Sequence, residues 1–372
     1  MNSSILRPVC GLLALLAGAA PGSAERWRIQ YFYDQDKSVL NLVDLQFPSV
    51  SRGVAVGVIQ EGTHQKPVAV VTSDAGVHWQ TTELQETPVS LFFLNEGLGW
   101  LVTAKGGLWK TTEAGRNWQK LPRIPSPAFH VYFIDENTGW AACAKKKVFQ
   151  TTDGGRSWSP VAAAAEPPGN PDYSVYSWIA FATPKVGIVT GYNLPPRRTF
   201  QRVPDWVDPE EALTRRDTPH LSYQLITLDG GKTWKSSSAS LFGEVSRLRL
   251  NPQGGGLGLI QYSPSFRYPS EVYQIDWRTG KNRTVFRDKR FHITDVGVTP
   301  DGTAYIAGPA VTGQIRNAIP TKVHVLVTRD FATWTEMDVD YKAVATRVVL
   351  AAAGPDNLWM ATDSGMILKL AK

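Results

Sequence analysis

One eight-residue pattern recurs along the chain and limits its fold more than any other feature. Its frame is Thr, any residue, Asp or Glu, any residue, Gly, two further residues and Trp. We call the four good copies box turns; they occupy residues 72–79, 111–118, 151–158 and 227–234, and a copy one residue short occupies 328–334. Self-similarity of this kind indicates a fold assembled from repeated units.

A second repeated element precedes the box turns. Residues 89–112 and 129–152 match along their length: an apolar strand, an acidic or Asn turn, Gly-Trp, a second strand, a tight turn, a third strand and then the box. Weaker copies begin near residues 42, 177, 246, 293 and 347. Together with the two clear copies, they indicate seven repeated units, each completed by a short fourth strand after its box.

These repeats predict an all-β fold, a seven-bladed β-propeller of four-stranded blades. Short β-branched and aromatic runs end in turn residues, and no long stretch has helical periodicity. The last copy ends at Leu370 after three strands, while residues 26–33 supply an unpaired strand near the N-terminus. We expect this strand to complete the seventh blade, because closure removes exposed sheet edges. Residues 25–372 then form a single domain, with an insertion in blade four at 192–221.

The box turns resemble Asp-box repeats, also called bacterial neuraminidase repeats. The Gly-Trp pattern before them is most similar to the photosystem II stability and assembly factor family, and the resemblance covers nearly all of residues 25–372. It implies that each box forms the turn between the third and fourth strands of a blade. It also implies a scaffold or assembly role, in which the protein holds a membrane-protein segment or a small protein. The insertion in blade four departs from the family pattern and leaves the partner open.

The box residues are expected to be structural. In the third copy, Asp153 can accept backbone hydrogen bonds, Gly155 can adopt φ > 0, and Trp158 can pack between sheets. Burial of an indole contributes about 4 to 6 kcal/mol, against about 1 kcal/mol for a turn hydrogen bond. Boxes spread around a ring cannot converge on one substrate, so we predict no catalytic box acid. The structural set is Thr72, Asp74, Gly76, Trp79, Thr111, Glu113, Gly115, Trp118, Thr151, Asp153, Gly155, Trp158, Thr227, Asp229, Gly231 and Trp234.

Residues 1–24 have the pattern of a secretory signal peptide. Arg7 precedes an apolar stretch at 9–20, and small residues end at Ala24. We therefore expect a secreted or periplasmic protein cleaved after Ala24. The apolar stretch is too short to span a bilayer, and no later stretch is long enough. Only Cys143 remains after cleavage, so an internal disulfide is excluded and a small buried core residue is expected.

One face of the predicted ring gathers basic and aromatic residues. Loops between second and third strands share this face, which we call the loop face, with the blade-to-blade loops; the box turns lie on the opposite face, the box face. Arginine and aromatic side chains are typical of binding hot spots, so we predict that the loop face binds a protein partner. The predicted contact residues are Lys105, Lys145, Lys146, Lys147, Arg197, Arg198, Arg202, Trp206, Arg215, Arg216, Phe266, Arg267, Tyr268 and Arg316. We place Tyr173, Tyr176 and Trp178 in the blade-to-blade loop before blade four.

The alternative function is a glycoside hydrolase, sialidase-like or glucanase-like, that uses inter-blade carboxylates. The candidate acids are Asp34, Asp36, Glu83, Glu86, Glu166 and Asp172, but no persuasive Tyr and Glu pair accompanies them. A third interpretation is that the basic loops are merely solvated. We favour binding over catalysis and leave the enzyme class open.

The remaining expectations concern ligands and assembly. The histidines have no ligand spacing, so no metal or cofactor is expected. A net charge of +6 is too small to imply nucleic acid, and we expect an acidic surface or a membrane-protein segment as partner. The protein is expected to be a monomer.

Overall fold

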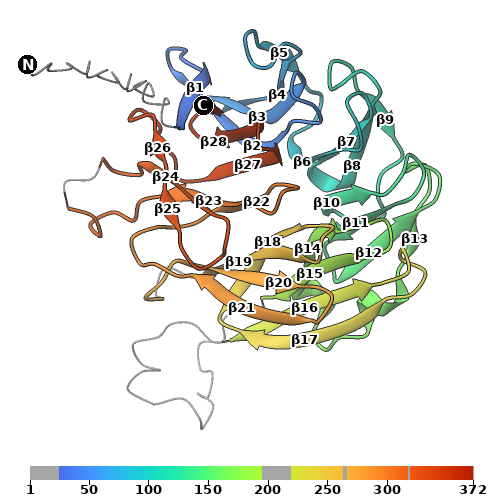
Figure 1. Ribbon diagram of the computed structural model, residues 1–372. Helices are drawn as coiled ribbons and strands as arrows, with labels where there is room; N and C mark the ends of the chain where they lie inside the picture. The colour runs from blue at the N-terminus through green and yellow to red at the C-terminus, as the bar shows by residue number, and fades with distance from the viewer. Residues whose placement is uncertain (1–24, 195–218, 263–265, 317–318, 372) are drawn as a thin grey trace, which may run out of the picture.

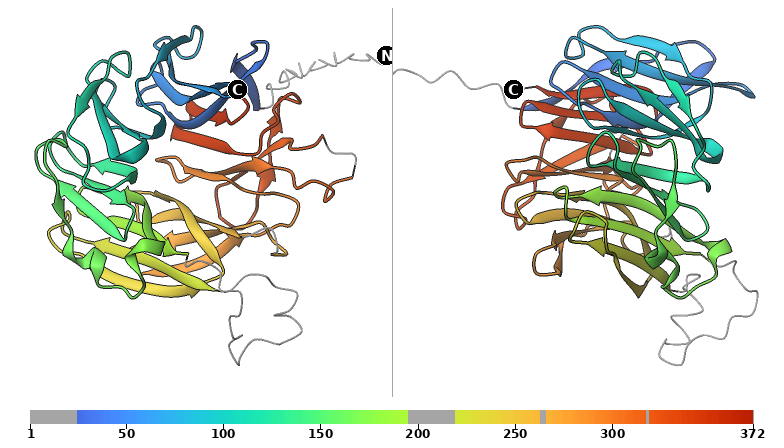
Figure 2. Two further views of the ribbon diagram at one scale, coloured as in Figure 1. Left: turned by 180° about the vertical axis from the view of Figure 1, so that it is seen from behind. Right: turned by 90° about the vertical axis from the view of Figure 1, so that its right-hand side faces the viewer.

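The computed structural model describes residues 25–194, 219–262, 266–316 and 319–371. Within them, seven sheets are arranged in a ring; in six of them the strands follow chain order from the centre outward, and in the seventh the N-terminal strand lies outside the last three strands of the chain (Figures 1 and 2). The predicted seven-bladed β-propeller with four-stranded blades is confirmed. Three short 3-10 helices accompany the strands: η1 (Ala104–Gly106), η2 (Ala162–Ala165) and η3 (Pro171–Tyr173).

The blades follow one another along the chain. Blade one comprises β2 (Ser38–Gln46), β3 (Gly53–Glu61), β4 (His64–Thr72) and β5 (Gln80–Glu83), and blade two comprises β6 (Pro88–Phe93), β7 (Gly99–Thr103), β8 (Gly107–Thr111) and β9 (Gln119–Leu121). Blade three comprises β10 (Ala128–Phe133), β11 (Gly139–Cys143), β12 (Lys147–Thr151) and β13 (Ser159–Pro160). Blade four comprises β14 (Ser174–Phe181), β15 (Gly187–Asn193), β16 (His220–Thr227) and β17 (Lys235–Leu241). Blade five comprises β18 (Gly243–Leu250), β19 (Gly255–Tyr262), β20 (Ser270–Asp276) and β21 (Lys281–Phe286). Blade six comprises β22 (Asp295–Val298), β23 (Ala304–Pro309), β24 (Val323–Thr328) and β25 (Thr335–Glu336). Blade seven comprises β27 (Val348–Gly354), β28 (Asn357–Thr362) and β29 (Met366–Ala371), together with β1 (Arg26–Phe32).

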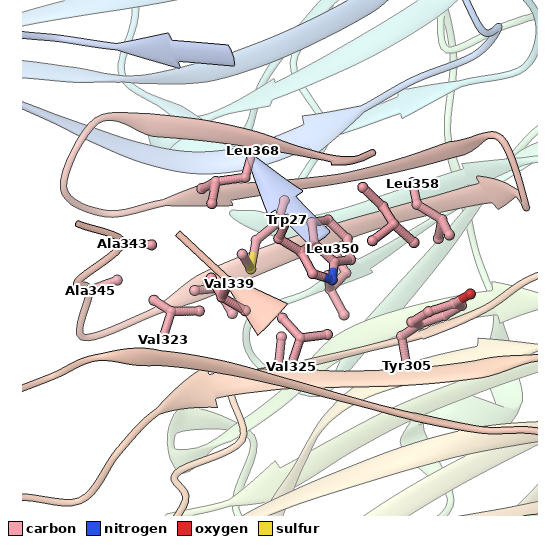
Figure 3. Close-up of a cluster of buried hydrophobic side chains, with 14 of the residues drawn as sticks. Trp27, Tyr305, Val323, Val325, Val339, Ala343, Ala345, Leu350, Leu358 and Leu368 are labelled. Atoms are coloured by element: carbon pink, nitrogen blue, oxygen red, sulfur yellow. The ribbon is translucent and has the colours of Figure 1, made fainter. Parts of the chain in front are cut away.

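The N-terminal strand closes the ring, as predicted. β1 pairs antiparallel with β29, and on its other side it pairs parallel with the short β26 (Asp338–Val339). Its Trp27 is fully buried in a cluster shared by blades six and seven, which includes Val325, Val339 and Leu368 (Figure 3). The strand thereby fills the outer position of blade seven and joins two blades through one side chain.

The tryptophans of the Gly-Trp pattern hold neighbouring blades together. Each is fully buried at the second strand of its blade and stacks on an aromatic ring of the inner strand, or just after it, in the next blade. The stacked pairs, with ring-centroid distances, are Trp100–Phe133 (3.7 Å), Trp140–Phe181 (4.7 Å) and Trp359–Phe47 (4.0 Å). Stacking of this geometry adds to the area that the rings bury.

Three of the four box turns share one set of hydrogen bonds. In the turn at 151–158, the Thr151 hydroxyl donates to Asp153 Oδ1 at 2.8 Å and accepts from the Gly155 N–H at 2.9 Å. Asp153 Oδ1 also accepts the Ser157 N–H at 2.9 Å. The turns at 72–79 and 227–234 have the same three bonds. The acid therefore orders the turn between third and fourth strands, as the sequence predicts.

The box tryptophans are less buried than predicted. All four are half-buried, and they contact the inner aromatic rings edge-on, as Trp234 does with Trp140 at 6.1 Å between centroids. The box glycine makes the closer approach to the preceding blade: a Cβ on Gly231 would lie 2.3 Å from the Trp140 ring. Blade contact at the boxes thus depends on the glycine and on the second-strand tryptophan more than on the box tryptophan.

The box acids predict a loss of stability in acid. Hydrogen bonds from the residue four positions later lower the pKa of Asp74, Asp153 and Asp229 to about 2. Because these folded-state pKa values lie below the ordinary value of about 3.9, the ionised acids stabilise the fold above about pH 5, and this contribution is lost as pH falls toward 2. A triple Asp→Asn variant should show a flatter fall of melting temperature between pH 5 and 2. Asp36→Asn is the control and should leave the pH dependence of the melting temperature as in the wild type. The prediction is contradicted if the triple variant also loses melting temperature between pH 5 and 2 as steeply as the wild type does.

Candidate binding face

The basic tight turns of the loop face are partly as predicted. Lys105, Lys145 and Lys147 are exposed beside the third strands of blades two and three. Lys146 is not: it is only 7% exposed, and its ammonium group donates to the backbone carbonyls of Ala165 and Pro167. Burial lowers its pKa. Lys146 is therefore not available on the loop face, contrary to the prediction that it contacts a partner, because these carbonyls enclose its ammonium group.

The blade-four insertion lies largely outside the described residues. The predicted contacts Arg197, Arg198, Arg202, Trp206, Arg215 and Arg216 all belong to residues 195–218. Arg316, in the loop between β23 and β24, is exposed. These placements leave the described part of the predicted surface on blades two, three, five and six.

The aromatic residues before blade four were misplaced. Tyr173 is 42% exposed in η3, but β14 begins at Ser174 and includes the other two residues. Tyr176 is fully buried, with its hydroxyl donating to the Ala164 carbonyl at 3.0 Å. Trp178 lines the central channel of the ring. Only Tyr173 therefore belongs to the loop face.

The loop face carries a pocket on blade five, which we call the blade-five pocket. It has a volume of about 260 Å³ and contains two of the predicted residues, Phe266 and Tyr268. The full lining is Ser240, Leu241, Phe242, Ile260, Tyr262, Phe266, Tyr268 and Arg287. Phe266 stacks on Tyr262 with centroids 5.0 Å apart, and the Arg267 and Arg287 guanidinium groups lie 5.4 and 5.5 Å from the Tyr268 ring. The pocket thus combines an apolar floor with a cationic rim.

A buried carboxylate fixes the polar side of this pocket. Glu271 accepts hydrogen bonds from Tyr262 at 2.7 Å, from Arg287 at 2.6 Å and from the Thr284 hydroxyl. Burial raises the pKa of Glu271, but these hydrogen bonds outweigh burial and hold it below its usual value. Because Glu271 stays ionised, Arg287 and Tyr262 are held in place before any partner arrives.

Sequence reasoning missed a second feature, the central channel. Two cavities of about 250 and 220 Å³ lie among the inner strands, the first toward the box face and the second toward the loop face. Trp178 separates them, with His130 stacked on one side at 4.0 Å and Arg247 at 4.6 Å. Polar residues at equivalent inner-strand positions, such as Asp44 and Asp295, were the signal that could have revealed it.

Those candidate glycosidase acids whose bonds the structure describes form structural contacts. Glu86 accepts hydrogen bonds from Lys120, Thr103 and Trp109, which outweigh burial and lower its pKa to about 2. The Tyr and Glu pair that the sequence did not reveal is Tyr192 and Glu244, hydrogen-bonded beside the channel. Burial, with the nearby Glu244, raises the pKa of Tyr192 to about 12, so this phenol is not an activated nucleophile.

Two further features are absent from the residues that the structure describes. No group of three or more His, Cys, Asp or Glu side chains is placed to hold a metal ion. No helix among these residues is long and apolar enough to cross a membrane. Cys143 is buried, and burial raises its thiol pKa, as expected for a core residue.

Comparison with known proteins shows the fold. No family model and no curated protein matches the chain. The solved structure of YCF48 bound to D1 peptide has a TM-score of 0.61 at 15% identity, covering 95% of this chain and 99% of that one. YCF48 from Cyanidioschyzon merolae gives a TM-score of 0.58 at 14% identity, covering 92% and 98%. Streptogramin B lyase gives 0.55 at 10% identity, covering 93% and 98%. Because one neighbour binds a peptide and another is named as a lyase, the shared fold does not decide between binding and catalysis.

Proposed function

We propose that this protein is an exported Asp-box propeller that binds a protein partner through its loop face, as a scaffold or assembly factor. The blade-five pocket carries this proposal, since its apolar floor and cationic rim are already in place. The repeated box hydrogen bonds support the Asp-box assignment, and residues 1–24 support export. The peptide bound to YCF48 supports a protein partner on a propeller of this shape.

The chemistry of the pocket specifies the partner segment. A volume of about 260 Å³ accommodates one large apolar or aromatic side chain against Phe242 and Phe266. The exposed Arg267 favours an acidic residue beside that anchor, and the exposed Arg316 adds positive charge on the loop face of the next blade. We therefore propose an acidic segment with a single bulky anchor, such as an extramembrane tail of a membrane protein.

The test compares variants of the pocket in capture experiments. A Phe266→Ala, Arg267→Glu variant should lose at least about tenfold in the amount of specific partner captured from a periplasmic or secreted extract, because both anchor and rim are changed. A synthetic peptide from the captured partner should then bind the wild type and bind the variant at least about tenfold more weakly. The matched control is Lys235→Glu, Lys281→Glu, which reverses exposed charges at the starts of the outer strands β17 and β21, away from the pocket.

Two results would contradict the proposal. Equal capture by the variant and wild type, with unchanged melting temperature, would exclude the blade-five pocket. Turnover of sialosides or β-glucans that is abolished by Glu244→Gln would favour the glycoside hydrolase instead, since Glu244 and Tyr192 are the pair that such an enzyme would use.

A further inference from the structure

The loop-face half of the central channel is a built pocket, separate from the blade-five pocket. Five inner strands each contain one extra residue, a β-bulge, in the register with the second strand of the blade. The extra residues are Val43, Val89, Phe129, Ser177 and Ser246, and all five line the 220 Å³ cavity. Bulges redirect side chains and are frequent next to binding sites. The bulges thus place five side chains, one from each of five blades, around the same cavity.

Arginine side chains supply positive charge on one side of this space. Asp295 lies near two of them, 3.6 Å from Arg247 Nε and 3.4 Å from Arg249 Nη2. Arg347, which lines the cavity, donates to the carbonyls of Leu42 and Val43 at 3.0 and 3.2 Å. Each guanidinium therefore keeps donor capacity beyond these bonds.

The neighbouring carboxylates are already committed to other donors. Asp44 accepts the Leu45 and Leu91 N–H groups at 2.8 and 2.7 Å, which ties blade one to blade two. Asp295 accepts the Val296 and Leu350 N–H groups in the same way at 2.8 and 2.9 Å. Glu244 is bonded to Tyr192, and burial raises the pKa values of both Asp44 and Glu244. These carboxylate oxygens are therefore partly engaged before any ligand binds.

Two hydroxyl groups in the same pocket point to a missing acceptor. Ser90 is only 4% exposed, and neither its Oγ nor that of Ser177 has a hydrogen-bond partner among the described residues. Both line the cavity, and the Arg247 Nε likewise lacks a hydrogen bond. Buried polar groups are normally paired, and an unpaired one is costly. Acceptor oxygens on a ligand would supply the missing partners.

Apolar side chains form another part of the lining. These are Val43, Val89 and Phe129, and Phe129 remains 38% exposed at the loop-face end. A ligand that fills the pocket therefore needs an acidic head toward the arginines and an apolar body toward these side chains. A planar carboxylate matches the guanidinium fork better than a spherical ion does.

We propose that the loop-face half of the channel binds a small monocarboxylate with a compact apolar or aromatic body. The carboxylate lies among Arg247, Arg347, Ser90 and Ser177, and the apolar body lies against Val89 and Phe129. The site is independent of the proposed partner-binding face, because it involves none of the residues of the blade-five pocket.

The experiment titrates the complete protein with benzoate by calorimetry and by NMR. We expect saturable binding with a Kd near 1 mM or below, and at least about tenfold weaker binding of benzamide, which has the same shape without the charge. A Ser90→Ala, Ser177→Ala variant should bind benzoate about tenfold more weakly at an unchanged or higher melting temperature, because the hydroxyls it loses have no partner in the fold. Ser238→Ala on the outer strand β17 is the matched control and should bind like the wild type.

Three outcomes would overturn the proposal. They are the absence of saturable benzoate binding up to about 10 mM, benzamide or inorganic phosphate binding as tightly as benzoate, and equal affinity in the serine variant. Benzoate affinity lost in Phe266→Ala but kept in the serine variant would likewise assign the binding to the blade-five pocket and refute the channel site.

Discussion

Replacing Trp27 with alanine is expected to lower the free energy of unfolding by about 3 to 5 kcal/mol, the range for removal of a fully buried large aromatic side chain. Trp27 is completely buried between blades six and seven, and its strand is the part of the chain that closes the ring. The cavity left behind would weaken the pairing of β1 with β29, which joins the two ends of the described chain in blade seven. Chemical denaturation monitored by circular dichroism measures this change.

The control for Trp27 lies on the same strand. Arg28 is exposed, so Arg28→Ala should change the free energy of unfolding by less than about 0.5 kcal/mol. If Trp27→Ala were as stable as Arg28→Ala, the N-terminal strand would not be required for closure, and blade seven would be held by its other three strands alone.

Replacing Gly231 with alanine is expected to destabilise the protein by about 2 to 5 kcal/mol. Its φ of +79° is costly for a residue with a Cβ, by about 1 to 2 kcal/mol. The new methyl group would also lie 2.3 Å from the fully buried ring of Trp140, and such overpacking costs a further 1 to 3 kcal/mol or so. Thermal or denaturant unfolding gives the sum of the two effects.

A Gly302→Ala variant separates the backbone cost from the overpacking cost of Gly231→Ala. It has a similar φ of +88°, but a Cβ there meets nothing within 4 Å. Gly302→Ala should therefore show only the backbone cost, about 1 to 2 kcal/mol. Equal losses in the two variants would mean that the box turn does not press against the preceding blade, contrary to the structure.

The sequence carried the architecture because its repeats mark the same position in successive blades. The Gly-Trp and box patterns recur where second strands and outer turns lie, and the strand containing Trp27 had no partner except the last blade. Loop geometry was harder to predict. Lys146 was misplaced because its ammonium group is held by the carbonyls of Ala165 and Pro167, which lie about twenty residues further along the chain. Trp178 was misplaced because the start of β14 could not be read from the residues before it.

The lining of the central channel was harder to predict because it depends on register. A single extra residue in each of five inner strands, such as Val89 beside Ser90, changes which side chains reach the cavity, and no local pattern specifies that bulge. The charged groups come from blades that are remote in sequence, such as Asp44 in blade one and Arg247 in blade five. Their proximity therefore exists only once the ring has closed.

Ring closure also brings the two ends of the described chain side by side. Arg26 is the direct antiparallel partner of Ala371. A few added residues could join these ends, and the chain could then be opened at another exposed turn, as in circular permutation. The order of the blades around the ring would be unchanged. The fold therefore does not depend on the blade at which the polypeptide chain starts.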